Sequence, residues 1–273
     1  MTKISTISKV ASAAILGAVL LTGCGSSSSD GATASSGAAI KGYLGKARIW
    51  ADFNKDGIKD SGEETDSVNG KFKFNDKPKA GDWVKVQVSS GIDAGDGKLF
   101  KGILKGILKD DGSVNATPIT TMVTTMVEIG DGNITAAENK VALQLGFTNA
   151  ADILKDPIAE AKTSTKLLKE SLKIGKMVEA MANGNTTNYG DIVSSIATSL
   201  NADSNISAAV TAILTTLVSV ANAAAAKTVI DAITGTSIIA STVVSGNNLV
   251  ITYDTSTGNV APITISNGDA DTG

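Results

Sequence analysis

Apolar and polar residues alternate along several short segments in the first half of the chain. Small and branched apolar residues fall on one face of extended segments at 46–52 and 83–89. Alternation with a period of two residues predicts half-buried β-strands. The pattern recurs at 71–74, after an Asn-Gly turn, and at 99–108, where two glycines interrupt it. We therefore predict a small β domain, a β-sandwich, at residues 39–112.

The hydrophobic period becomes helical after Thr117 and Pro118, which are typical of an N-cap and a first helical position. Thr135 and Glu138 match a capping box, which predicts another helix start. Further candidate caps are Asn149, Asp156, Asn188 and Asn205. Together these signals predict an α-helical domain at 113–235, with helices at 118–129, 135–145, 149–155, 157–182, 188–200 and 206–233.

The last of these helices is the most apolar part of the chain. Residues 206–226 carry no charge, which raises a transmembrane interpretation. Polar side chains nevertheless recur at helical spacing on one face, and this favours a buried or groove-forming helix. That polar face consists of Ser207, Thr211, Thr215, Ser219 and Asn222.

The strand pattern returns after Gly235, with candidate strands at 237–244, 249–253 and 260–265. We expect a C-terminal β segment at 236–267, a hairpin or meander, followed by a disordered tail at 268–273. Its strands could complete the N-terminal sheet, cover the helices or pair with another molecule. The predicted fold class is therefore α+β.

A short apolar stretch at 11–21 follows the positive Lys3 and Lys9 and ends in the lipobox Leu21-Thr22-Gly23-Cys24. A transmembrane helix is disfavoured because the stretch is too short to span a bilayer; a plain secretory signal is the other alternative. The segment resembles the signal peptide of bacterial lipoproteins, at residues 1–23. That resemblance implies lipidation of Cys24 and anchoring to the membrane, and Gly25 is compatible with sorting to the outer membrane.

Residues 24–38 are small and polar without apolar periodicity, so we expect a flexible tether after the lipidated cysteine. The chain contains no histidine and a single cysteine. This inventory excludes disulfides, histidine-based catalysis and Cys or Ser-His-Asp nucleophiles. Removal of residues 1–23 takes away two of the 24 basic residues and no acid, which changes the formal charge from −3 to −5. An acidic chain of this kind is not expected to bind nucleic acid.

Residues 52–63 match the twelve-residue calcium loop at its diagnostic positions. Oxygen atoms at positions one, three, five, seven, nine and twelve can surround one hard cation, and Gly57 permits the sharp turn at position six. An Asx-rich turn between strands is the alternative, because the same residue types favour turns. We predict a Ca²⁺ site formed by Asp52, Asn54, Asp56, the carbonyl of Ile58, Asp60 and Glu63.

Residues 40 to about 105 resemble the calcium-loop β-sandwich modules of bacterial surface proteins, such as B-repeat and carboxypeptidase-regulatory-like domains. The resemblance is carried by Ile40-Lys41-Gly42, the loop at 52–63, Thr65-Asp66 and Gly70-Lys71-Phe72. It implies that the module is structural or adhesive and that the loop residues ligate calcium. Surface adhesins usually contain many such modules, whereas this chain has one followed by helices. Outside this loop, Asp93, Asp96, Asp110, Asp111 and Asp131 are interpreted as turn residues, and the alternative is that they extend an acidic rim.

We expect a lipid-anchored, calcium-binding protein of the bacterial envelope, exported to the outer membrane or cell surface, that acts without catalysis in binding, adhesion or scaffolding. Its expected partners are the membrane, through Cys24, and an envelope protein or a glycan. One alternative is a carboxylate-dependent glycan hydrolase, a reaction that needs no histidine. Another is a carrier of lipids or other hydrophobic ligands, with the helix at 206–233 lining a groove.

Overall fold

The computed structural model describes residues 35–95, 97–182, 189–201, 206, 239–245, 248–253 and 263–266. Strands and helices are both present, so the predicted α+β class is confirmed. Several predicted segments lie outside the described residues: the signal peptide, Cys24 with the tether up to residue 34, the helix at 206–233 apart from Ile206, and the tail at 268–273.

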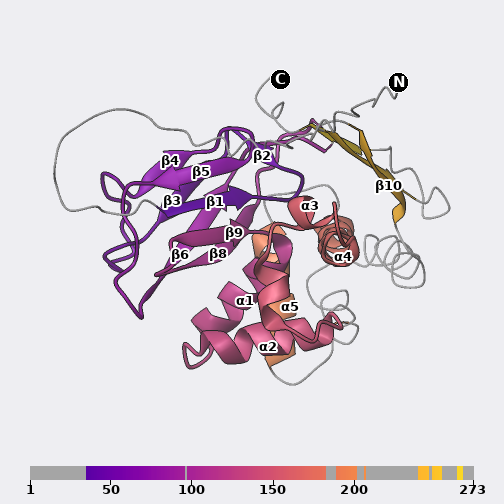
Figure 1. Ribbon diagram of the computed structural model, residues 1–273. Helices are drawn as coiled ribbons and strands as arrows, with labels where there is room; N and C mark the ends of the chain where they lie inside the picture. Colours follow the sequence, from indigo (N-terminus) through magenta and orange to yellow (C-terminus); the bar gives the residue numbers. More distant parts are fainter. Residues whose placement is uncertain are drawn as a thin grey trace, which may run out of the picture. The chain divides into compact units, whose positions relative to one another are not determined.

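An antiparallel sheet has the strand order β4-β3-β6-β8 (Figure 1). Its strands are β3 (Arg48–Ala51), β4 (Glu64–Asp66), β6 (Trp83–Ser89) and β8 (Ile103–Lys109). The side chains of β6 and β8 alternate between buried and partly exposed positions, as expected for strands with one face in the core. The strand predicted at 99–108 begins later, at Ile103, while Leu99 forms an isolated bridge to Ile92.

A second sheet has the order β5-β1-β9 and contains β1 (Ser35–Ala39), β5 (Lys71–Phe74) and β9 (Ser113–Ala116). The central strand β1 is antiparallel to β5 and parallel to β9. It includes residues 35–38, which the sequence predicted as tether. The small side chains permit close approach of the strands, because a Cβ atom on Gly37 would lie 2.1 Å from the Val114 carbonyl oxygen. Strand β9 covers the first four residues of the range 113–235, which was predicted to be the helical domain.

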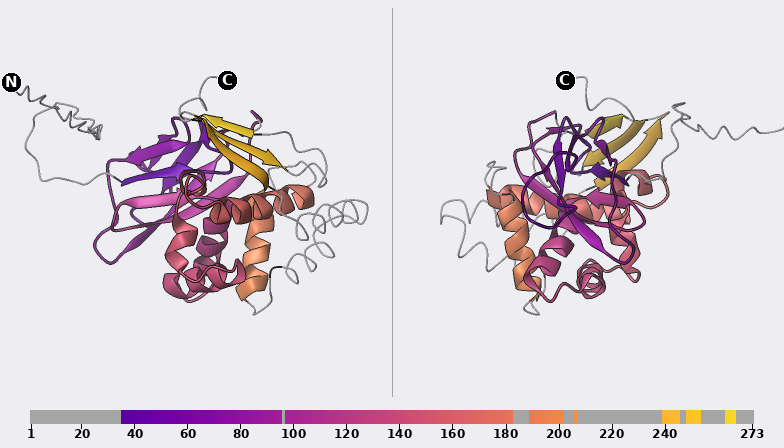
Figure 2. Two further views of the ribbon diagram at one scale, coloured as in Figure 1. Left: turned by 45° about the vertical axis from the view of Figure 1, so that its right-hand side comes forward. Right: turned by 90° about the vertical axis from the view of Figure 1, so that its left-hand side faces the viewer.

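Two short strands, β2 (Leu44–Gly45) and β7 (Ile92–Asp93), form an antiparallel pair. The C-terminal strands β10 (Ile239–Ser245), β11 (Asn248–Tyr253) and β12 (Ile263–Ser266) form an antiparallel sheet in chain order, which Figure 2 shows in yellow.

Helix α1 (Pro118–Ile129) has the predicted bounds and the predicted N-cap, Thr117. Helix α2 (Ile134–Gln144) begins one residue earlier than predicted. Its cap is Asn133, whose side chain accepts a hydrogen bond from the Ala136 N–H, so the capping box predicted from Thr135 is wrong. Glu138 instead pairs with Lys109. A 3₁₀ helix, η1 (Ala150–Leu154), follows Asn149 as its cap.

The single helix predicted at 157–182 is two helices, α3 (Pro157–Glu160) and α4 (Lys166–Ala182). The polar residues between them explain the break: the backbone and hydroxyl of Thr163 and the Ser164 N–H all donate to the Glu160 carbonyl. Such local hydrogen bonds compete with helix continuation. Helix α5 (Tyr189–Asn201) follows, and the predicted caps Asn188 and Asn205 lie outside the described residues.

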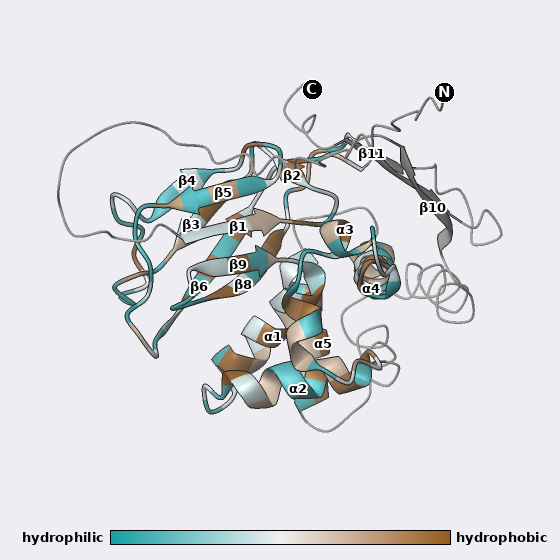
Figure 3. Cartoon of the chain, in the orientation of Figure 1, coloured by the Kyte–Doolittle hydropathy of each residue, from teal (hydrophilic) through white to brown (hydrophobic). Residues whose placement is uncertain are grey.

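One hydrophobic core includes residues of both N-terminal sheets and of the helices. Leu104 and Leu108 of β8 belong to it together with Met122 of α1 and Ile196 of α5. Figure 3 shows the corresponding alternation of hydropathy along β5 and the hydrophilic residues of α2. The predicted boundary at 112/113 therefore does not separate two cores. Among the described helices, none combines the length and apolarity that a membrane crossing needs.

Candidate functional site

The predicted calcium loop connects β3 to β4 at one edge of the four-stranded sheet. Asp52 directly follows the last residue of β3, and Glu63 directly precedes β4, while the pairing of Trp50 with Glu64 holds the two ends together. Gly57 and Gly62 have φ values of +76° and +94°. These left-handed conformations favour glycine and allow the chain to fold back between the two strands.

Asp52, at the first loop position, is 9% exposed. Its Oδ2 atom accepts a hydrogen bond from the Gly57 N–H at 3.1 Å. Its Oδ1 atom is buried and has no hydrogen-bond partner among the described residues. A buried carboxylate oxygen without a donor is energetically unfavourable, so this atom is a position where a cation would be stabilised.

The side chains of Asn54, Asp56 and Asp60 come together at the exposed end of the loop. The Asn54 amide nitrogen donates to Asp56 Oδ2 at 3.0 Å and to Asp60 Oδ2 at 2.8 Å. Its amide oxygen accepts from the Asp56 N–H at 3.1 Å. The amide hydrogens thus occupy a place between two carboxylates that suits a positive charge.

Glu63, at the last loop position, is buried, with 6% of its surface exposed. Its Oε1 atom accepts from the N–H groups of Phe53 at 2.8 Å and Asn54 at 3.3 Å. Its Oε2 atom accepts from the Asp60 N–H at 3.2 Å and from the Trp50 indole N–H at 3.3 Å. This carboxylate therefore ties both halves of the loop to β3.

Ile58 is 62% exposed, and its N–H donates to Asp56 Oδ1 at 2.7 Å. Its carbonyl remains a predicted ligand. In the described part of the chain, no three or more acidic side chains are gathered tightly enough to hold a metal as they stand. The residue types still suit a hard cation, because all five side chains carry oxygen atoms and Asp52 Oδ1 accepts no hydrogen bond in the described structure. Coordination would require the Asn54 amide to turn its oxygen inward. A ligand role for Glu63 would require its carboxylate to give up some of the four N–H hydrogen bonds that it accepts.

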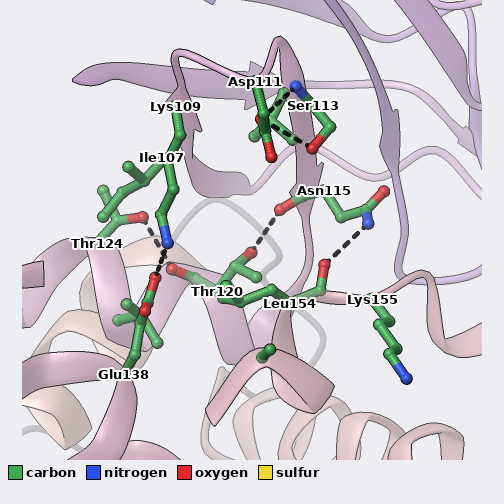
Figure 4. Close-up of a pocket in the computed structure, with 13 residues that line it drawn as sticks. Ile107, Lys109, Asp111, Ser113, Asn115, Thr120, Thr124, Glu138, Leu154 and Lys155 are labelled. Atoms are coloured by element: carbon green, nitrogen blue, oxygen red, sulfur yellow. Dashed lines mark hydrogen bonds and ion pairs between the residues drawn. The ribbon is translucent and has the colours of Figure 1, made fainter. Parts of the chain in front are cut away.

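A pocket of about 400 Å³ lies away from this loop, among β8, β9, α1, α2 and η1 (Figure 4). The Lys109 ammonium and the Glu138 carboxylate form an ion pair of 2.6 Å within it. Asp111, on the same pocket, accepts from the N–H and hydroxyl of Ser113. Both carboxylates are therefore engaged within the protein, and Asp111 has the turn role expected from the sequence.

The remaining acidic residues have separate roles. Asp131 accepts from the Asn133 N–H two residues later, as turn residues do. Asp110 lies between β8 and β9 and accepts from the Gly81 N–H, 29 positions away in the chain. Asp93 accepts from the Gly95 N–H in the same local way, but its side chain is also buried, with 3% exposed, and it pairs with Lys41. This pair could not be predicted from the sequence, since 52 positions separate its members. Asp96 lies outside the described residues.

Comparison with known proteins adds no assignment: no family model, no curated protein and no solved structure matches the chain.

Proposed function

We propose that this chain is a lipid-anchored, calcium-binding protein of the bacterial envelope, whose folded part acts as a non-catalytic binding, adhesion or scaffolding module. The observation that carries the proposal is the loop at 52–63. It combines a buried oxygen of Asp52 that has no hydrogen-bond partner among the described residues with the side chains of Asn54, Asp56 and Asp60 gathered at the turn. In this proposal the ion takes the place of the Asn54 amide hydrogens between Asp56 and Asp60, and it provides the positive partner that the Asp52 Oδ1 atom lacks in the described structure.

The finer fold proposal is that the two N-terminal sheets constitute a calcium-stabilised β-sandwich, similar to the modules of bacterial surface proteins. Support comes from Phe72 and Phe74 of β5, which share the core with Ile49 of β3 and Val86 of β6. Calcium at the β3–β4 connection would fix the edge of one sheet. The helices and the C-terminal sheet are then the candidates for partner recognition.

Calorimetric titration with Ca²⁺ tests the metal proposal, with melting temperature measured in calcium and in chelator. We expect saturable one-site binding that raises the melting temperature, because a ligand that binds the folded state stabilises it. Asp52→Asn and Asp56→Asn should abolish both effects. Asp66→Asn is the matched control, since Asp66 is an exposed residue of β4 outside the loop. Absence of binding at millimolar calcium would show that the loop is an Asx-rich turn.

The anchoring proposal rests on the lipobox and is tested separately. Cys24→Ser should move the protein from the membrane fraction to the soluble exported fraction and abolish incorporation of labelled palmitate. If the variant remains in the membrane fraction, another part of the chain attaches it.

A hydrolase acting on glycans is a second candidate, because Asp111 and Glu138 line the same pocket (Figure 4). Glycoside hydrolysis uses two carboxylates on either side of the bond. Turnover of an envelope glycan that disappears in Glu138→Gln, with the melting temperature retained, would establish this function instead.

A further inference from the structure

The pocket among β8, β9, α1, α2 and η1 has the size and the wall of a small-molecule site. Its volume of about 400 Å³ lies in the range of pockets that hold small ligands. The side-chain amide of Asn115 bridges β9 to η1 by donating to the Leu154 carbonyl at 2.9 Å (Figure 4). Branched apolar side chains form part of the wall: Ile107, Val114, Val123 and Leu154. The tertiary packing of five elements therefore forms a space with apolar surface.

One ion pair in this pocket retains unused bonding capacity. Lys109 Nζ lies 2.6 Å from Glu138 Oε1, and the two side chains are 36% and 10% exposed. Neither has a second ion-pair partner among the described residues. An ammonium carries three hydrogens and a carboxylate accepts at two oxygens, so each group can take another partner of opposite charge.

A buried lysine elsewhere in the fold shows the opposite case. Lys41 Nζ lies 2.6 Å from Asp93 Oδ2 and 2.7 Å from Glu179 Oε1. In this Lys41–Asp93–Glu179 cluster the lysine already has two acidic partners, and none of the three residues lines the pocket. Lys109 has one acidic partner and faces a cavity, so it is the lysine with room for a ligand.

The other two charged residues of the pocket wall have partners within the protein. Asp111 accepts from the N–H and hydroxyl of Ser113. Lys155 lies 3.0 Å from Asp152 and 3.5 Å from Glu160. Two lysines and two acids line the pocket in total, so their formal charges cancel. The wall therefore favours a ligand that carries both charges over one with a net charge.

The wall also distinguishes among ligands by shape. None of the described residues that line the pocket is aromatic, so a sugar ring would have no aromatic face to pack against. The apolar side chains of Ile107, Val123 and Leu154 instead suit an aliphatic group, which gains free energy on leaving water.

We propose that this pocket binds a zwitterionic α-amino acid with an aliphatic side chain. The ligand's carboxylate pairs with Lys109 and its ammonium with Glu138, and its side chain packs against the apolar part of the wall. An α-amino acid carries its two charged groups on one carbon, which matches the close approach of Lys109 and Glu138. Hydrogen bonds between charged groups are stronger than neutral ones. The site shares no residue with the loop at 52–63, so this inference does not depend on the calcium proposal.

Calorimetric titration of the full chain with L-leucine, in chelator, tests the proposal. We expect saturable one-site binding that raises the melting temperature. N-acetyl-leucine lacks the ammonium and leucinamide lacks the carboxylate, so each should bind at least about tenfold more weakly. Glycine retains both charges, and its affinity should be lower by about fourfold for each methylene that is no longer buried.

Three results would overturn the proposal. One is the absence of leucine binding at millimolar concentration. Another is equal affinity for leucine, N-acetyl-leucine and leucinamide, because the two charges would then have no role. The third is saturable binding of glucose in place of leucine, which would assign the pocket to a sugar.

Two charge variants test the assigned pair. Glu138→Gln and Lys109→Met each remove one charge, and each should weaken leucine binding at least about tenfold. Lys105→Gln is the matched control, because Lys105 pairs with Glu128 at 2.6 Å but does not line the pocket. It should bind leucine with wild-type affinity.

A variant that fills the pocket provides an independent test. Ala151 is an exposed residue of η1 on the pocket wall, so Ala151→Phe occupies the space without removing a charge. Leucine binding should be lost while circular dichroism shows a folded chain. Wild-type affinity for leucine in Ala151→Phe would show that leucine binds elsewhere. Calcium titration of the same variant reports on the loop alone, so failure of this proposal and failure of the calcium proposal are separate results.

Discussion

Glu63 shows how one side chain can organise a loop through hydrogen bonds within the protein. Its two oxygens accept from three loop N–H groups and from the Trp50 indole, and the carboxylate is almost fully buried. A buried group that accepts several hydrogen bonds stabilises its surroundings mainly because its removal would leave donors unpaired. Glu63 is therefore expected to contribute to folding even in the absence of calcium.

We predict that Glu63→Gln lowers the free energy of unfolding in chelator by about 1–3 kcal/mol, because an amide NH₂ replaces one of the two accepting oxygens. Urea denaturation measures the difference. Glu64→Gln is the matched control: Glu64 is exposed and pairs with Lys59 at 3.2 Å on the surface. Such pairs contribute about 1 kcal/mol or less, so the control should unfold close to wild type. Equal losses in both variants would contradict the role given to Glu63.

The residues of the predicted calcium loop could be proposed from sequence because the twelve positions are contiguous and their spacing has a stereochemical meaning. The Lys41–Asp93–Glu179 cluster could not, because its members come from a turn, a strand and a helix that only the tertiary fold brings together. A single lysine, and an aspartate followed by Ala94 and Gly95, have no local signal for burial. The side chains that a fold brings together over long distances are thus the part of a site that periodicity misses.

At the scale of elements, the threonines of α1 connect this helix to the strands before it. Thr120 Oγ1 accepts from the Thr117 N–H at 2.8 Å and lies within donating distance of the Lys105 and Asn115 carbonyls, at 2.8 and 2.9 Å. Thr121 Oγ1 accepts from the Lys105 N–H at 2.8 Å. These hydroxyls provide hydrogen bonds to the backbone of β8 and β9 where the two strands meet the helix.

We predict that Thr120→Val destabilises the protein by about 1–3 kcal/mol, because the substitution leaves a buried N–H and buried carbonyls with fewer partners. Thr124→Val provides the comparison, since Thr124 Oγ1 donates only to the Thr120 carbonyl of its own helix among the described contacts. Removing that hydroxyl should change stability by at most about 1 kcal/mol. Thermal unfolding of the two variants distinguishes them, and a larger loss in Thr124→Val would refute the argument.

Elements with strong local signals were predicted closely, and those that depend on neighbours were not. Strands β5 and β6 have the predicted bounds because their side chains alternate clearly, and helix α1 has them because its period and its N-cap agree. Strand β1 was assigned to a tether because Ser, Gly and Ala carry no hydrophobic period. Its position is set by β5 and β9 on either side, where a larger side chain at Gly37 would collide with Val114.

At the scale of the whole molecule, Tyr43 links the sheets to the helices. Its hydroxyl donates to Asp156 Oδ2 at 2.8 Å, while Asp156 Oδ1 caps α3 by accepting from the N–H groups of Ile158 and Ala159. Lys71 of β5 pairs with the same carboxylate at 2.6 Å and lies 4.4 Å from the centre of the Tyr43 ring. Tyr43 is 7% exposed, so this contact is largely removed from water.

The Tyr43 contact predicts a loss of stability at alkaline pH. Burial raises the pKa of Tyr43 above its ordinary value of 10.0, and the Asp156 charge raises it further. Above about pH 10 the tyrosine ionises in the unfolded chain but stays protonated in the folded one. Ionisation lowers the free energy of the unfolded state alone, so the free energy of unfolding falls as pH rises. Tyr189 has a raised pKa as well and should add to the decline.

We predict that Tyr43→Phe lowers stability at neutral pH by about 1 kcal/mol, through loss of the hydroxyl's bond to Asp156, and flattens the decline above pH 10. Tyr189→Phe should flatten the decline without a loss at neutral pH, because the Tyr189 hydroxyl has no partner in the described structure. Urea denaturation from about pH 8 to about pH 11 measures both effects. If Tyr43→Phe follows the wild-type pH profile, the Tyr43–Asp156 contact between sheet and helix is not maintained in solution. A loss of stability at neutral pH in Tyr189→Phe would instead show that the Tyr189 hydroxyl has a hydrogen-bond partner. The first contact to examine would be a hydrogen bond to the Lys41–Asp93–Glu179 cluster.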